Sequence, residues 1–255
     1  MLWSKAWRET RWRFLIGFAL LMCSAAVTVL GYPRLVELMK VMPNTDTGGE
    51  LGRQIRESIE LARDYRGYVW SQWFLKTMSQ QWVLFAALLG AGGLLARSAG
   101  SGTLFMLSLP VSRRRIVGIR AATGLVELLA LALVPSLLLP LLSPAIGHTY
   151  GLGDALIHGS CLFVAGSVFF SLSFLLSTVF HDVWRPWLIV LGGAGVLSLL
   201  EQVSPGFSRH GLSRVMGAES YFRGGGLPWL GLIVSAGVSV AALYAATRNI
   251  ERRDF

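Results

Sequence analysis

Long apolar blocks constrain this chain more than any other feature of its sequence. They run for about 15 to 25 residues each and are separated by polar segments, and about 20 apolar residues in a helix cross the hydrocarbon core of a bilayer. Hydrophobic residues make up 53% of the chain and charged residues only 15%, with a mean hydropathy of +0.56. A soluble domain of 255 residues needs more charge to cover its surface. The sequence therefore predicts an all-α polytopic membrane protein.

Six of the blocks are predicted to form transmembrane helices, and the whole chain, residues 1–255, is predicted to be a single membrane domain. The predicted spans cover approximately residues 14–32, 82–96, 121–142, 155–180, 186–200 and 227–246. In an alternative interpretation, span two begins earlier, near Phe74, and Lys76 extends its ammonium group to the interface. Two longer segments, at about 33–81 and 201–226, are predicted to be external loops. Within the first, Glu50 to Arg66 is predicted to form an amphipathic helix, because its apolar residues share one helical stripe.

Residues 1–13 have the pattern of a helix that lies along the membrane surface. Trp3, Trp7 and Phe14 recur at near-helical spacing, and Lys and Arg residues stand between them. Such an amphipathic helix buries its aromatic face at the level of the lipid headgroups. We therefore expect an elbow helix that leads into span one.

The distribution of Lys and Arg predicts the orientation of the chain. Of the 23 basic residues, 13 fall in predicted inner segments that total about 50 residues, and 10 fall in predicted outer segments of about 85 residues. Basic loops stay on the cytoplasmic side, so both termini are predicted to be cytoplasmic. The net charge of +9 is thereby explained by topology and contact with membrane lipids, and no basic patch interleaved with aromatic residues indicates nucleic-acid binding.

The motifs of the common catalytic and metal sites are missing from the sequence. No GxxxxGK[ST] run cradles a nucleotide phosphate, and no HExxH, CxxC or GxSxG motif occurs. Cys23 and Cys161 both fall inside apolar blocks, and the four histidines are far apart in the chain. We predict no catalytic residues, no metal site and no cofactor bound by this chain.

Glu127 is the one carboxylate deep inside an apolar block, in predicted span three. Acids within a membrane are costly and often functional, so Glu127 is a candidate for a transport pathway or an ion site. The alternative is a structural role, in which Glu127 pairs with Arg120, with another Arg of the cytoplasmic side or with water. The sequence leaves both interpretations open.

Small residues in spans two and five allow close helix contacts. Gly90 and Gly93 in span two, and Gly192 and Gly193 in span five, are candidates for a seam between two copies of the chain. Close packing within one subunit explains the same pattern equally well.

A basic island, residues 97–120, separates predicted spans two and three. It holds five Arg residues and no acid. A short apolar piece, Thr103 to Leu109, is ended by Pro110, and Arg113, Arg114 and Arg115 follow. A short helix stopped by proline makes a rigid projection whose apolar side chains can fill a groove on a partner.

The island resembles the cytoplasmic loop between spans two and three of the ABC-2 family of transporter permeases. The similarity is carried by Gly102, Thr103, Leu104, Phe105, Met106, Leu107, Ser108, Leu109, Pro110, Val111, Ser112 and Arg113. The start, KAWRETRWRFLIG, is similar to the family's elbow helix, and the end, NIERRDF, is similar to family tails. The family usually has an acid about four residues before the Gly-Thr pair, and this chain has Ser98 there.

The resemblance implies the permease subunit of an ATP-binding cassette exporter in a prokaryotic plasma membrane. A separate ATPase subunit would hold ATP and Mg, and a second permease subunit, identical or different, would complete the transporter. The coupling helix would dock the ATPase through Thr103, Leu104, Phe105, Leu107, Leu109 and Pro110, with Arg113, Arg114 and Arg115 beside it.

Two other functions are compatible with the residues. An ion- or proton-coupled carrier would use Glu127 and no ATP. A membrane scaffold would recruit an ATPase through the same island without transporting anything. The identity of the cargo is not predicted, because no polar constellation in the sequence selects one.

Overall fold

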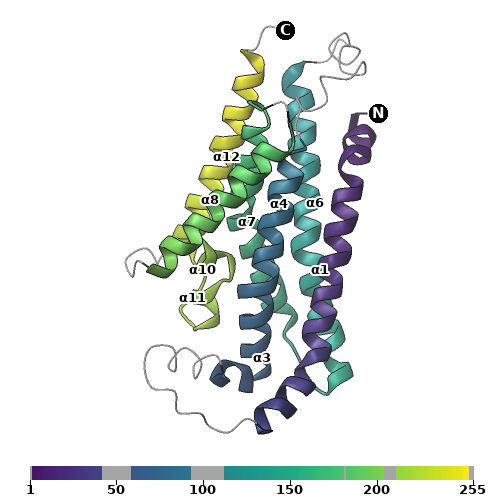
Figure 1. The fold of residues 1–255 in the computed structure, drawn as a ribbon, viewed down its shortest axis with the longest axis vertical. Helices are drawn as coiled ribbons and strands as arrows, with labels where there is room; N and C mark the ends of the chain where they lie inside the picture. Colours follow the sequence, from purple (N-terminus) through teal and green to yellow (C-terminus); the bar gives the residue numbers. More distant parts are fainter. Residues whose placement is uncertain (1, 42–58, 93–111, 181, 204–210, 253–255) are drawn as a thin grey trace.

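The computed structural model describes residues 2–41, 59–92, 112–180, 182–203 and 211–252. Within these ranges the chain is helical between its turns, and no described residue forms a β-strand. The long helices lie side by side along the long axis of the molecule (Figure 1). The prediction of an all-α fold is confirmed.

The bundle has one central helix, α7. Its elements in chain order are α1 (Leu2–Val41), α3 (Tyr65–Tyr68), the π-helix η1 (Val69–Met78), α4 (Ser79–Gly90), α6 (Arg113–Leu142), the 3₁₀-helix η2 (Ser143–Ile146), α7 (Leu152–Leu176), α8 (Trp184–Val203), α10 (Leu212–Met216), α11 (Glu219–Phe222) and α12 (Trp229–Glu251). Helix α7 packs against α4, α6, α8, α10 and α12, and α1 packs on the outside against α6 and α4.

Four helices are long and apolar enough to cross a membrane: α1, α6, α7 and α12. They fall at predicted spans one, three, four and six. Helices α4 and α8 lie where spans two and five are predicted, and they are not among the four in the described part of the chain. A membrane protein with transmembrane helices is therefore supported, and the count of six spans stays a prediction.

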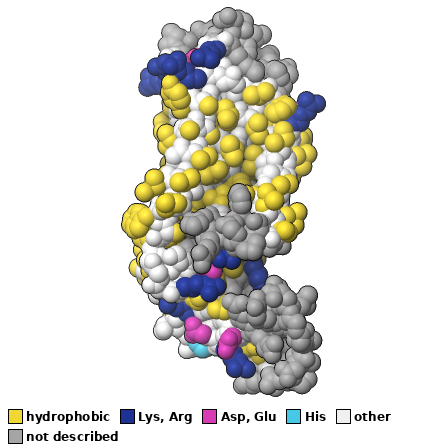
Figure 2. All heavy atoms as spheres, turned by 90° about the vertical axis from the view of Figure 1, so that its left-hand side faces the viewer, with side chains coloured by type: hydrophobic (Ala, Val, Ile, Leu, Met, Phe, Trp, Pro, Cys, Tyr) yellow, Lys and Arg dark blue, Asp and Glu magenta, His cyan; other side chains and the backbone are white. Residues whose placement is uncertain are grey.

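The surface of the bundle has the distribution of side chains that a bilayer requires. Hydrophobic side chains cover the middle of the face that carries α8 and α12, and charged side chains gather toward its two ends (Figure 2). Large apolar residues such as Ile233, Val240 and Val196 are more than half exposed there. In lipid this exposure carries no hydrophobic penalty, because the surrounding acyl chains are equally apolar.

The predicted elbow helix and span one are parts of one helix. Helix α1 continues from Leu2 to Val41 with no break near residue 13, and it contains Pro33, where the external loop was predicted to begin. No proline falls near residue 13, and proline is tolerated in membrane helices whose neighbours satisfy the freed backbone groups. A separate elbow lying along the membrane is thus not observed, although Trp3, Trp7 and Trp12 remain at the surface.

The segment predicted as external loop 33–81 is largely helical where it is described. Residues 59–63, α3 and η1 lead without a long loop into α4, so the helical stretch begins well before Trp82. The alternative start of span two near Phe74 lies within this helical stretch, inside η1. The sequence does not show the usual periodicity of an α-helix here, because polar residues such as Lys76 and Ser71 alternate with aromatic residues. The segment is a π-helix, whose period differs from 3.6 residues per turn.

Helix α6 begins eight residues earlier than predicted span three. It starts at Arg113, so Arg113, Arg114 and Arg115 form its first turn instead of a loop. The boundary of a hydrophobic block marks where the chain enters lipid, and a helix continues beyond it wherever no breaker follows. Pro135 and Pro140 lie within the same helix. The second predicted loop, 201–226, contains the end of α8 and the short helices α10 and α11.

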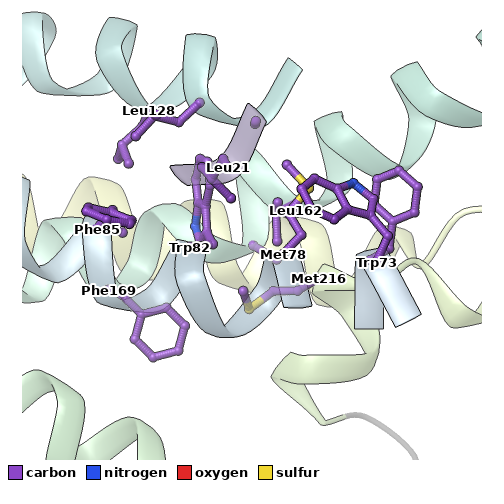
Figure 3. Packing of buried hydrophobic residues seen from close by; sticks show 14 of the residues in the cluster. Leu21, Trp73, Met78, Trp82, Phe85, Leu128, Leu162, Phe169 and Met216 are labelled. Atoms are coloured by element: carbon purple, nitrogen blue, oxygen red, sulfur yellow. The ribbon is translucent and has the colours of Figure 1, made fainter. Parts of the chain in front are cut away.

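Large aromatic and sulfur-containing side chains fill the core. Trp73 and Trp82, both fully buried, come from the η1–α4 stretch and lie among Leu21 of α1, Leu128 of α6 and Leu162 of α7 (Figure 3). Helix α4 fits closely against α7, because the Cβ of an alanine at Gly166 would lie 2.0 Å from Nε1 of Trp82. This contact brings α4 and α7 close together in the core.

Candidate functional site: the basic end of the bundle

Three helix ends meet beside the basic island. The guanidinium of Arg114 in α6 binds the carboxylate of Glu251 at the end of α12, with 3.2 Å between Nη2 and Oε2. Arg120, two turns further along α6, forms an ion pair with Glu9 of α1. We call this region, where α6 starts beside the N-terminus of α1 and the C-terminus of α12, the basic end (Figure 1).

The two ion pairs of the basic end differ in their surroundings. Both side chains of the Arg120–Glu9 pair are only 15% exposed, whereas Arg114 is 70% exposed. Exposed ion pairs contribute little to stability, because water and salt screen them. The Arg120–Glu9 pair is therefore the stronger link, and it joins α1 to α6.

Glu127 lies deeper in the bundle, between α6 and α1. Its side chain is 2% exposed, and one carboxylate oxygen accepts a hydrogen bond from the hydroxyl of Thr10. The other oxygen, Oε2, is buried and has no hydrogen-bond partner among the described residues. A buried polar atom without a partner costs free energy, so this oxygen is available to a proton, a water molecule or another donor.

Of the structural alternatives for Glu127, the pairing with Arg120 is not observed. Arg120 pairs with Glu9 instead, and Glu127 is bound by Thr10. Seven residues separate the two side chains on one helix, which is roughly 10 Å along the helix axis. That distance is too long for a direct ion pair, while both side chains reach the neighbouring α1.

A small cavity of about 20 Å³ lies next to this cluster. A space of this size holds about one water molecule. Arg13 of α1 lies near it and donates a hydrogen bond from Nη1 to the carbonyl oxygen of Leu88, at 3.3 Å. The lining consists of Ala6, Glu9, Thr10, Leu89, Gly90, Gly92, Arg120, Thr123, Gly124, Phe170 and Phe174. In this conformation the cavity is too small for a metabolite.

Most of the predicted ATPase-docking residues lie outside the described part of the chain. These are Thr103, Leu104, Phe105, Leu107, Leu109 and Pro110, and the side chain of Arg113 is also outside it. Arg114 and Arg115 are described, and both are exposed in the first turn of α6. Their position leaves them accessible to an acidic partner or to anionic headgroups.

The four glycines predicted as candidates for a contact between two subunits differ in their surroundings. A Cβ at Gly90 would lie 2.4 Å from the carbonyl oxygen of Phe170, so Gly90 serves the α4–α7 contact within the subunit. Gly192 and Gly193 of α8 are exposed, and nothing in the described chain lies within 4 Å of a Cβ placed there. Gly93 lies outside the described residues. The α8 glycines stay candidates for a contact with another chain, and Gly90 is explained without one.

Sequence reasoning missed a polar cluster at the opposite end of the bundle. Asp154 of α7 accepts hydrogen bonds from Arg66 Nε at 2.9 Å and from the hydroxyl of Tyr221 at 2.8 Å. The bond to Asp154 stabilises the phenol, and it raises the pKa of Tyr221 above its usual value. The three residues are far apart in the sequence, so only the density of aromatic residues near residue 66 hinted at a packed region.

His158 lies one turn further into α7 and is completely buried. Its Nδ1 is 3.1 Å from the carbonyl oxygen of Gly217, so this nitrogen carries the proton and donates it. The ring stacks on Phe74, with 4.6 Å between centroids, and Nε2 has no partner among the described residues. No group of three or more His, Cys, Asp or Glu side chains in the described chain could hold a metal ion.

Neither a family model nor a curated protein nor a solved structure matches this chain.

Proposed function

We propose that this protein is the permease subunit of an ATP-binding cassette transporter, driven by a separate ATPase subunit. The observation that carries the proposal is the run Gly102 to Arg113, which leads directly into helix α6. An apolar segment followed by proline and three arginines suits a docking element for a soluble partner. A second permease subunit would contact the first through the exposed glycines of α8.

The ion pairs of the basic end supply a physical route from a docked ATPase to the membrane. A force on the island acts on the start of α6, and Arg120–Glu9 and Arg114–Glu251 link α6 to α1 and α12. The Thr10–Glu127 hydrogen bond adds a second link between α1 and α6. These helices would move together when the ATPase closes on ATP. In a complete transporter this shift would open a path at the seam between subunits.

Copurification tests the proposal most directly. The tagged protein, solubilised gently from its native membrane, is expected to bring a stoichiometric ATPase that mass spectrometry identifies. Replacing Phe105 and Leu107 by Asp is expected to release that ATPase, because charges cannot enter an apolar groove. The control carries Asp at Ala99 and Ser101, which lie in the same island outside the apolar piece.

The outcome also separates transport from recruitment. Vesicles that contain both subunits are expected to move a cargo only when ATP is hydrolysed. Retention of the ATPase by the doubly substituted chain would contradict docking through the apolar piece. ATPase binding without any ATP-dependent transport would favour the scaffold.

An ion- or proton-coupled carrier is the second candidate, because Glu127 is buried with one oxygen unpartnered among the described residues. It predicts ion-driven uptake by the isolated chain without an ATPase. The replacement Glu127→Gln would abolish that uptake, whereas Glu37→Gln, at an exposed acid of α1, would not. Ion-driven uptake that survives Glu127→Gln would exclude Glu127 as the ion site.

A further inference from the structure

A groove of about 310 Å³ lies on the side of the bundle, between α4, α7, α8 and α10. Small-molecule sites in proteins measure about 300–1,000 Å³, so this groove has the size of a small binding site. Its walls are mainly apolar and are formed by Val83, Phe169, Leu191, Ala194, Leu197, Leu212 and Met216. Helix α8 crosses the bundle obliquely, and α10 lies beside its C-terminal part (Figure 1).

Glu201 gives the groove its one charge. It stands in the last turn of α8, and no other lining residue is charged. Its carboxylate accepts a hydrogen bond from the hydroxyl of Ser213, and the backbone N–H of Ser213 lies 3.5 Å from Oε1. Among the described residues no Lys or Arg pairs with Glu201, and the nearby Arg214 pairs with Glu219 instead. The groove therefore combines apolar walls with an anion that has no cationic partner there.

The local backbone fixes the carboxylate in this place. A Cβ at Gly211 would lie 2.7 Å from Cδ of Glu201 and 2.9 Å from Oε2, so the carboxylate fits only against a glycine. Ser79, Gln80 and Ser198 add polar groups to the lining without adding charge. A carboxylate beside an apolar groove is stabilised by a cation that brings hydrogen bonds or charge to it.

We propose that this groove binds an amphipathic cation, a molecule with an apolar chain or ring system and an ammonium group. The apolar part lies along α4, α7 and α8, and the ammonium group sits at Glu201. The negative charge of Glu201 attracts a cationic head group, and it favours this ligand over a neutral lipid or an anion. The inference rests on the proposed transporter function, for which it names a class of cargo.

Binding to the isolated chain tests the groove without any ATPase. The full-length protein in lipid nanodiscs is titrated with dodecyltrimethylammonium, dodecyl maltoside and dodecyl sulfate, which share one alkyl chain and differ in head group. Partitioning into empty nanodiscs is subtracted. We expect saturable binding of the cation, about tenfold tighter than that of the neutral probe, which corresponds to about 1.4 kcal/mol. The anion is expected to bind most weakly.

Matched variants assign the binding to the groove. Glu201→Gln is expected to remove the preference for the cation and to leave binding of the neutral probe unchanged. Glu37→Gln, at an exposed acid of α1, keeps the preference. Ala194→Trp fills the groove and reduces binding of all three probes. If Ala194→Trp does not give monodisperse protein, Ala194→Leu is used in its place.

Three results would overturn the proposal. Equal affinity for the three head groups means that charge selects nothing, and an unchanged preference in Glu201→Gln means that the cation binds elsewhere. A groove covered by a second copy of the chain would bind no probe until the dimer dissociates, which also overturns it. Because no ATPase is present, failure here leaves the copurification experiment untouched, and failure to copurify an ATPase leaves the binding result untouched.

Discussion

Individual residues decide how closely the helices of this bundle approach. Gly90 and Gly166 lie on the two sides of the α4–α7 contact, and a Cβ added at either glycine would lie within 2.4 Å of an atom of the other helix. Ser173 of α7 also donates a hydrogen bond to the carbonyl oxygen of Ala87 in α4, at 2.6 Å. Small residues and hydroxyl bonds of this kind replace the hydrophobic effect as the source of helix association in lipid.

Replacing Gly90 by Ala is expected to lower stability by roughly 1–3 kcal/mol. The new methyl group meets a backbone carbonyl, which cannot turn aside as a flexible side chain can. Gly118→Ala in α6 is the control, because nothing in the described chain lies within 4 Å of its Cβ. Unfolding in detergent monitored by tryptophan fluorescence measures both. Equal stability of the two variants would contradict the close α4–α7 contact.

Replacing Arg120 by Gln is expected to destabilise the protein by about 1–3 kcal/mol. The substitution removes the ion pair between Arg120 and Glu9, whose side chains are both only 15% exposed. Arg114→Gln is the matched control at the same end of α6, and its stability should stay near that of the wild type because Arg114 is 70% exposed. Denaturant titration compares the three proteins. A larger loss of stability in Arg114→Gln than in Arg120→Gln would contradict the conclusion that Arg120–Glu9 is the stronger ion pair.

At the scale of elements, the unusual feature is η1, ten residues of π-helix in front of α4. It carries Trp70, whose indole N–H donates to the carbonyl oxygen of Gly217 at 2.9 Å and whose ring stacks on Phe222 at 4.2 Å. His158 donates to the same carbonyl. The Gly217 peptide group, the Phe222 ring and the Tyr221–Asp154 hydrogen bond therefore link the segment of α10 and α11 to the bundle. Helix α10 also forms a wall of the groove.

Replacing Trp70 by Phe is expected to loosen α10 and α11 without unfolding the bundle. The variant keeps a ring over Phe222 but loses the hydrogen bond to Gly217, a loss of about 1 kcal/mol. Hydrogen exchange of the amides in Leu212–Met216 should accelerate by about fivefold. Trp229→Phe is the control, because Trp229 is 64% exposed. Unchanged exchange in the Trp70 variant would show that other contacts hold this segment.

At the scale of the molecule, the basic end fixes the arrangement of the termini. The N-terminal turns of α1 and the C-terminal turn of α12 both pair with the start of α6, so the two ends of the chain lie at the same end of the bundle. Helix α1 then runs to the opposite end (Figure 1). Its 40 residues make roughly 60 Å of helix, about twice the thickness of the hydrocarbon core.

Cysteine labelling is expected to show two accessible ends on one side of the membrane and one on the other. Single cysteines at Arg115 and Arg252, near the basic end, should react with an impermeant maleimide from the same side, and one at Glu37 from the opposite side. All three positions are exposed. Cys23 and Cys161 are first replaced by Ser and Ala. Labelling of all three from one side would mean that α1 does not cross the membrane.

Much of the architecture follows from the sequence alone. The apolar blocks predicted a helical membrane protein and located α6, α7 and α12 to within about eight residues, because the bilayer sets the length of a spanning segment. They failed at residues 33–41 and 67–81, where the helices continue through proline and polar residues. The amphipathic helix predicted over Glu50 to Arg66 is confirmed at its described residues 59–63 and 65–66. Hydropathy locates the residues at which a helix leaves the hydrocarbon core of the bilayer. It does not locate the end of a helix that continues outside the core.

The sequence by itself determined the class of fold, the run Gly102 to Arg113 within the basic island and the isolated acid at Glu127, because each depends on residues that are close together in the chain. Only the tertiary structure decided the partners of those residues: Thr10 binds Glu127, Glu9 binds Arg120, and Gly211 and Ser213 hold Glu201 at the end of a groove. These contacts join different helices. Their formation depends on how helix surfaces fit together, which the spacing of residues along one helix does not specify.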